Sequence, residues 1–159
     1  MGISLEEIEF RTVRADDPKE FRTYLRIFWD IPLQHNRYFT KRSDAFIDDW
    51  MASARAQETE QNTHSGIAVH GDDIVGIHIL RAYEEYERQG AHIAGLWVRE
   101  DLRRFGIARR LKEAGEAWAR SIGAEWLNTN VQADNAQMLR INERAGFRLF
   151  RMNLRKDLV

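Results

Sequence analysis

A strand gives way to a helix at RRFGIA, residues 103–108. The stretch follows an apolar run, AHIAGLWV (residues 91–98), which is typical of a strand buried on both faces. It leads into ARRLKEAGEAWARSIG (residues 108–123), whose apolar residues recur at helical spacing. Two arginines, a glycine and an alanine therefore gather at the start of a helix.

This corner has the chemistry of an anion site. A helix N-terminus offers backbone N–H groups without an intrahelical partner and about half a unit of positive charge. Gly106 allows a ligand to approach, Ala108 keeps bulk away, and the guanidinium groups of Arg103 and Arg104 can fork onto phosphate oxygens. The alternative is an ordinary surface helix start whose arginines lie in water.

The composition indicates one soluble globular domain. The chain has 159 residues, of which 43% are hydrophobic and 31% charged. It has no cysteine and no signal-like N-terminus, from which we expect a cytoplasmic protein. No apolar run has the length of a membrane helix, and a net charge of −1 gives no general attraction for nucleic acid.

Periodicity and turn residues predict ten elements in the order β-α-α-β-β-β-α-β-α-β. We expect strands at 7–14, on either side of a turn at 71–73, at 91–98, at 125–131 and, as one long or two very short strands, at 147–158. We expect helices from Pro18 to Pro32 and over 43–60, 105–121 and 134–146. The order predicts an α/β fold with a mixed sheet, antiparallel at first and parallel near the end.

Particular residues should begin and end these helices. Asp16 or Asp17, Ser43 and Asp134 are the expected N-caps, and Gly146 the residue after the last helix. The third helix should bury one stripe of side chains, formed by Ile107, Leu111, Ala114, Trp118 and Ile122.

Two segments resemble the GCN5-related N-acetyltransferase (GNAT) superfamily: LWVREDLRRFGIARRL (residues 96–111) and NTNVQADNAQMLRINERAGF (residues 128–147). The first contains the family pattern Q/R-x-x-G-x-G/A, which holds the pyrophosphate of acetyl-CoA. The second contains N-x-x-A/M followed by G-F. The matching residues are Arg103, Gly106 and Ala108 in the first pattern, and Asn135, Met138, Gly146 and Phe147 in the second.

The resemblance implies that the fourth and fifth strands splay apart and that the pantetheine arm of acetyl-CoA lies between them. The acetyl group would pass directly to an amine, with no metal and no covalent enzyme intermediate. The implied cofactor contacts are Leu96, Trp97, Val98, Arg103, Arg104, Phe105, Gly106, Ile107, Ala108, Asn135, Met138 and Asn142. Arg104 departs from the pattern, because the family often has glycine there.

Proton transfer requires residues outside these two patterns. The family often places a Glu or His early in the fourth strand, and His92 occupies that region. His92 is a candidate general base, or else a hydrogen-bonded histidine of the strand. Asn142 stands where many members have a tyrosine that protonates the thiolate, so we expect a cofactor contact there and name no general acid.

The resemblance places the acceptor under the loop between the first two helices, FWDIPLQHNRYFTKR (residues 28–42). Trp29, His35, Tyr38 and Phe39 could line an aromatic pocket, or could simply pack the loop onto the sheet. Only twelve residues follow Phe147, so a second subunit could complete the pocket and we expect a homodimer. The identity of the amine stays open.

We therefore expect an acetyl-CoA-dependent N-acetyltransferase acting on an amine of a small molecule or a protein. A non-catalytic acyl-CoA sensor or scaffold is the first alternative. The second is a nucleic-acid patch, because residues 99–110 hold five arginines against Glu100 and Asp101, a local excess of three positive charges.

Overall fold

The computed structural model describes residues 3–60 and 62–158. Contacts divide the chain into two compact units, one ending at Thr129 and one beginning at Asn130. The prediction of a single domain over 1–159 stays a prediction. Within the described residues, no helix combines the length and the apolar character needed to cross a membrane.

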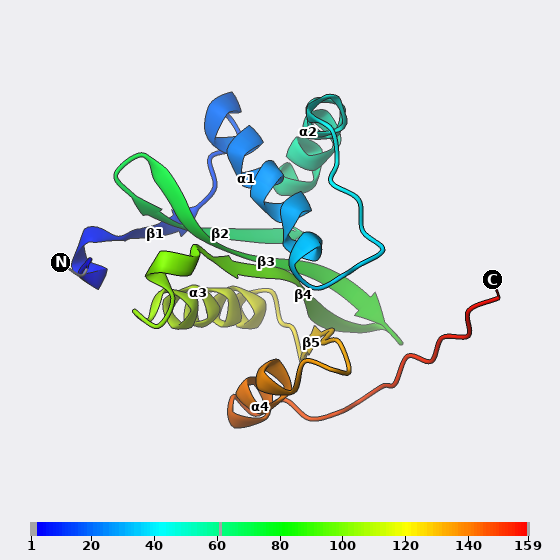
Figure 1. The fold of residues 1–159 in the computed structure, drawn as a ribbon. Helices are drawn as coiled ribbons and strands as arrows, with labels where there is room; N and C mark the ends of the chain where they lie inside the picture. The colour runs from blue at the N-terminus through cyan, green and yellow to red at the C-terminus, as the bar shows by residue number, and fades with distance from the viewer. Residues whose placement is uncertain (1–2, 61, 159) are drawn as a thin grey trace. The chain divides into compact units, whose positions relative to one another are not determined.

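The first unit is built on a five-stranded sheet (Figure 1). Its strands are β1 (Glu9–Thr12), β2 (Thr63–His70), β3 (Asp73–Glu85), β4 (Arg88–Val98) and β5 (Leu127–Thr129), and they lie side by side in that order. The first four strands pair antiparallel, and β4 pairs with β5 in parallel. The predicted mixed sheet, antiparallel first and parallel last, is confirmed.

Three helices cover the two faces of this sheet (Figure 1). On one face lie α1 (Pro18–Asp30) and α2 (Asp44–Thr59), joined through the 3₁₀ turn η2 (Ile31–Gln34), and on the other lies α3 (Ile107–Ser121). Two further 3₁₀ turns are η1 (Leu5–Glu7) and η3 (Glu100–Leu102). The N-caps of α1 and α2 are Asp17 and Ser43, which accept hydrogen bonds from first-turn amides as expected.

The apolar core is deepest under β2 and β3. On the face of α1 and α2, Phe21 and Ile47 are fully buried against Ile67 and Ile77. On the other face, Leu111 packs with residues of β2, β3 and β4. By contrast β4 is mostly half-buried, so the prediction of a strand buried on both faces is wrong. The reason is that α1 and α2 pack mainly on β3 and β2, whereas only the short η2 contacts β4 on that face.

The buried stripe of α3 also differs from the expected one. Ala114 is exposed, and the buried positions are Ile107, Leu111, Gly115 and Ala119. A Cβ on Gly115 would lie 2.7 Å from His78 Nδ1 and 2.8 Å from Leu80 Cδ1, so the helix touches the sheet through its glycine. A hydrophobic pattern does not count glycine and therefore missed this line of contact.

The second unit contains α4 (Ala136–Arg144) and an extended segment after it. Its N-cap is Asn135, whose side chain accepts from Met138 N–H at 3.1 Å, so the prediction of Asp134 is wrong by one residue. Gly146 follows the helix at φ 91°, the left-handed conformation expected of it. No ladder forms over the described residues 147–158, so the strand predicted there is wrong.

Two histidines are buried between the sheet and α3. His78 is 1% exposed, and its Nδ1 lies 3.2 Å from the Leu111 carbonyl oxygen. His64 is 9% exposed and stacks on Trp118. Burial lowers the pKa of His64, and burial is also the main reason that the pKa of His78 falls to about 4.

We expect stability to fall between neutral pH and pH 5. The unfolded chain, with an ordinary histidine pKa of about 6.5, binds more protons than the native state in this range. His78 alone then removes about 2 kcal/mol of unfolding free energy, as urea titrations at the two pH values would measure. His78→Gln keeps a neutral donor and should reduce this pH dependence, whereas His35→Gln, at an exposed position, should not. An equal pH dependence in His78→Gln and the wild type would contradict the assignment.

Candidate functional site

The loop RRFGIA ends in an uncapped helix. Gly106 is the N-cap of α3 at φ 88°, and no side chain among the described residues caps the first amides. Arg110 N–H donates to the Gly106 carbonyl at 3.1 Å, so the amides of residues 107–109 precede the first helical bond. The helix begins two residues after the expected Phe105, which leaves its open amides directly behind the glycine.

The positive charge of the loop is concentrated in two arginines. The other three arginines of residues 99–110 are engaged: Arg99 with Asp101, Arg109 with Glu113 and Arg110 over the Phe10 ring. Arg103 and Arg104 make no ion pair with any described residue. Arg103 Nε donates to the Val98 carbonyl at 3.1 Å, which holds its guanidinium against the end of β4. The loop thus brings two unneutralised cations to a helix N-terminus.

Beside this loop, β4 and β5 part. Their ladder covers Ala91–Ile93 and Leu127–Thr129, and β4 continues to Val98 with no strand of the described chain on that side. Arg99 N–H bonds to β3, and backbone groups alternate in direction along a strand, so Leu96 and Val98 direct theirs into the gap. Trp97 directs its backbone toward β3. The splay implied by the resemblance is present.

A bulge in β4 marks the point of separation. Ile79 is opposite Gly95 and Leu80 is opposite Ile93, which leaves Ala94 without a partner. The extra residue shifts the register and brings Gly95 against Ile31 of η2, whose Cδ1 would lie 3.1 Å from an added Cβ. The bulge was not predicted from the sequence, although a glycine within a strand is a recognised signal for one.

The remaining cofactor candidates lie in the second unit. Asn135, Met138 and Asn142 are spaced by three and four residues on α4, so they share one face of the helix. Met138 and Asn142 are half-buried. The backbone carbonyl of Asn142 accepts from Ala145 and Phe147, which ties this face to the helix end.

A polar row crosses the first unit one residue before the splay. Arg81 on β3 pairs in register with His92 on β4, which pairs with Asn128 on β5. Residues in register point to the same face, here the face of α1 and α2. His92 is half-buried and makes no hydrogen bond to a described residue. Its pKa is lowered, mainly by burial and secondarily by the charge of Arg81.

A tyrosine supports this row from the neighbouring position. Tyr83 Oη accepts a hydrogen bond from Trp126 Nε1 at 2.6 Å and another from Asn128 Nδ2. Gly90 makes the contact possible, because an added Cβ would lie 2.4 Å from Trp126 Nε1. These residues were not found by sequence reasoning, since Tyr83, Gly90 and Asn128 lie on three different strands, Trp126 immediately precedes the third of them, and the group matches no local pattern.

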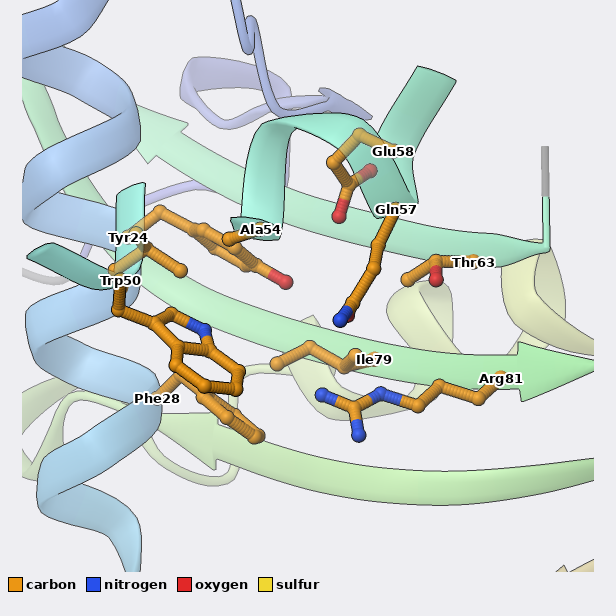
Figure 2. Close-up of a pocket in the computed structure, with 10 residues that line it drawn as sticks. Tyr24, Phe28, Trp50, Ala54, Gln57, Glu58, Thr63, Ile79 and Arg81 are labelled. Atoms are coloured by element: carbon orange, nitrogen blue, oxygen red, sulfur yellow. The ribbon is translucent and has the colours of Figure 1, made fainter. Parts of the chain in front are cut away.

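A second polar group lies in a pocket between α1, α2 and the sheet (Figure 2). Ser65 Oγ donates to Glu58 and lies 2.7 Å from Tyr24 Oη. Burial raises the pKa of both Glu58 and Tyr24. Figure 2 shows Arg81 entering the same pocket from β3, with its guanidinium directed toward Phe28.

The predicted acceptor residues have different surroundings. Trp29 packs against the rings of Phe46 and Trp50 between α1 and α2, which is a packing role. His35 is exposed, and Tyr38 is 59% exposed. Arg42 lies over the ring of Phe39. Their part in acceptor binding stays a prediction.

Comparison with known proteins gives one family. A sequence model of the acetyltransferase (GNAT) family matches residues 19–147. No curated protein sequence matches the chain.

Solved structures share the fold at low identity. An aminoglycoside acetyltransferase from an uncultured soil metagenomic sample, solved with trehalose, has a TM-score of 0.72 at 16% identity, over 98% of this chain and 99% of that one. An acetyltransferase from Trypanosoma brucei has 0.68 at 20%, over 95% and 99%. Glucosamine-6-phosphate N-acetyltransferase from Arabidopsis thaliana has 0.68 at 12%, over 96% and 99%. Such identities show similarity of fold alone.

Proposed function

Because the chain belongs to the acetyltransferase (GNAT) family, we propose that it is an acetyl-CoA-dependent N-acetyltransferase that passes an acetyl group directly to an amine. The observation that carries the proposal is the loop RRFGIA, with its uncapped amides and two unneutralised arginines at the start of α3. The neighbours named for aminoglycosides and for glucosamine 6-phosphate leave the acceptor open, because these amines differ in charge.

The residues of the loop fit a pyrophosphate. The amides behind Gly106 would donate to phosphate oxygens, and Arg103 and Arg104 would neutralise part of the charge. Leu96 and Val98 would bind the pantetheine amides through backbone groups facing the gap. The other proposed contacts with the cofactor in the first unit are Trp97, Phe105, Ile107 and Ala108. The proposed contacts from the second unit are Asn135, Met138 and Asn142.

His92 is the proposed base. An alkyl ammonium with a pKa near 10.4 must lose a proton before attack, which costs about 4.6 kcal/mol at pH 7, whereas an α-amine near 7.8 costs about 1.1 kcal/mol. The lowered pKa of His92 keeps its imidazole neutral and able to take this proton. The amine nitrogen then bonds to the acetyl carbon and releases its second proton to water, the C–S bond breaks, and the thiolate takes a proton from water.

A binding assay distinguishes a pyrophosphate site at the loop RRFGIA from an ordinary helix start. Arg103→Ala should weaken CoA binding by about ten- to a hundredfold, the usual value of a charged hydrogen bond. Gly106→Asp should weaken it further, because it adds a negative charge and a side chain at φ 88°. Arg120→Ala, on the exposed end of α3, is the control and should bind normally. Calorimetry measures the affinity, and transfer to an amine panel measures turnover.

Each outcome has a defined meaning. Tight CoA binding without transfer to any amine would replace the enzyme with an acyl-CoA sensor or scaffold. Unchanged CoA binding in both variants would refute the proposal that the loop RRFGIA binds the pyrophosphate. Salt-sensitive binding of RNA or DNA that CoA does not displace would favour the nucleic-acid reading.

The pH profile tests the base. With an alkyl amine, kcat/KM should fall with pH below a break that lies under the ordinary histidine pKa of about 6.5, since the base must be neutral. His92→Ala should lose this break and follow only the deprotonation of the amine. His70→Ala is the control and should keep the profile of the wild type. A break that survives in His92→Ala would end the assignment.

We also propose a homodimer that uses the segment after α4. Phe150, Met152 and Leu154 alternate with polar residues, and together with Leu158 they are 66% to 86% exposed, so this part of the segment presents large apolar side chains to solvent. A second copy could cover these side chains.

Light scattering with size exclusion tests the dimer. The wild type should elute at twice the mass of the chain, and Met152→Lys with Leu154→Lys should shift it to the monomer because two charges would be buried. Arg151→Lys, on the alternate face, should remain dimeric. A wild type that is monomeric at high concentration would refute the dimer.

A further inference from the structure

Three polar residues, Arg81, His92 and Asn128, form a row across the sheet beside the proposed acetyl-transfer site. These residues lie in register on β3, β4 and β5, one residue before the last pair of the β4–β5 ladder. They face the side of α1 and α2, but those helices pack mainly on β2 and β3 while η2 touches β4. The row therefore borders the splay, on a sheet face that the helices cover only in part.

Arg81 is the cation of this row. Its side chain is exposed and lies over the ring of Phe28 at 5.7 Å, and it makes no ion pair or hydrogen bond with a described residue. Glu58, the carboxylate of the same pocket, accepts a hydrogen bond from Ser65 and acts on Arg81 only through its charge, without a close ion pair. The five N–H donors of a guanidinium match a carboxylate or a phosphate in geometry and charge. Arg81 is therefore poised to bind an anionic group.

The other two members of the row can accept hydrogen bonds from an amine. His92 is half-buried, with no hydrogen-bond partner among the described residues. Asn128 Nδ2 donates to Tyr83 Oη, a bond held in place by Trp126 on the same oxygen. Since the amide nitrogen is used there, Asn128 Oδ1 is turned away from Tyr83 and can accept a hydrogen bond.

Charge decides which amines suit this arrangement. An ammonium group beside His92 also lies beside Arg81, and like charges at neighbouring positions repel. The segment that begins with η2, which contacts β4, also carries Arg37, Lys41 and Arg42, and residues 31–43 contain no acidic side chain. An acceptor with only positive charges is therefore disfavoured, whereas an acceptor with its own anion satisfies Arg81. Adjacent strands are about 4.8 Å apart, so the two groups can be separated by only a few bonds.

We propose that the acceptor is a small amine that also bears a carboxylate or phosphate group, which Arg81 binds while the amine lies between His92 and Asn128. This inference rests on the proposed function, because it names the substrate class of the same site. It makes Arg81 a residue of specificity and Asn128 a residue that positions the amine.

Matched pairs of amines test the charge requirement. Glycine against glycinamide examines a carboxylate, phosphoethanolamine against ethanolamine examines a phosphate, and spermidine represents a polycation. In the wild type, kcat/KM should be at least about tenfold higher for the anionic member of one pair, the value of one charged hydrogen bond. The pair that shows the difference identifies the anion. Preference for the neutral amines or for spermidine would overturn the proposal.

Variants test the role of Arg81 itself. Arg81→Gln should lower kcat/KM for the anionic amine about ten- to a hundredfold more than for its neutral partner, mostly through KM. Arg81→Lys should recover part of the loss. Arg120→Gln is the control, because this exposed arginine is paired with Glu116 on α3. An equal loss for both members of a pair would refute specificity through Arg81.

Binding without turnover separates the two proposals. Thermal shifts with each amine, in the presence of CoA, do not depend on acetyl transfer. A larger shift with the anionic amine that disappears in Arg81→Gln supports the inference, even if no amine is acetylated and the enzyme proposal fails. Equal shifts for the two members of each pair would overturn the inference, even if acetyl transfer is observed.

Discussion

The early end of the ladder between β4 and β5 is the constraint on which the site depends. Beyond Ile93 and Thr129, no strand of the described residues pairs with the β5 side of β4, and unpaired peptide groups need other partners. Val98 finds one in Arg103, which also fixes the direction of the loop that follows. The bulge at Ala94 places the change of register at the same level. One interruption of the sheet thus creates the gap, orients the loop and sets the start of α3.

The same interruption separates two kinds of chemistry in the first unit. Beyond the end of the ladder, the groups available to a ligand are the backbone groups of β4 and the arginines of the loop, which suit phosphates. Before it lies the row of Arg81, His92 and Asn128, where side chains on three strands are held in register by the sheet. Backbone groups suit a cofactor whose chemistry is constant, whereas side chains are where a family can vary its acceptor.

Local signals were sufficient for much of the fold. Ser43 and Asp17 accept amide hydrogen bonds where the sequence predicts helix starts, because capping depends only on residues two or three positions away. The loop RRFGIA was found for the same reason. Gly115 and Ala94 were missed because their roles are set by what lies across the core or the ladder. The Tyr83 cluster joins residues 43 and 45 positions apart, beyond the reach of any local pattern. Residues 150–155 alternate like a strand, but alternation predicts a face and does not supply a pairing partner.

Arg104 shows how function and folding compete at a single residue. It has φ 70°, a conformation that costs a residue with a Cβ about 1 to 2 kcal/mol and glycine almost nothing. The backbone at Arg104 thus has the left-handed conformation that favours glycine, while the side chain contributes a second unneutralised guanidinium. Selection for a higher melting temperature would favour glycine or asparagine here. Either substitution would remove a positive charge from the N-terminus of α3. Thermostability and anion affinity are therefore opposed at position 104. Variants selected for stability should bind anions more weakly, and variants selected for anion binding should be less stable.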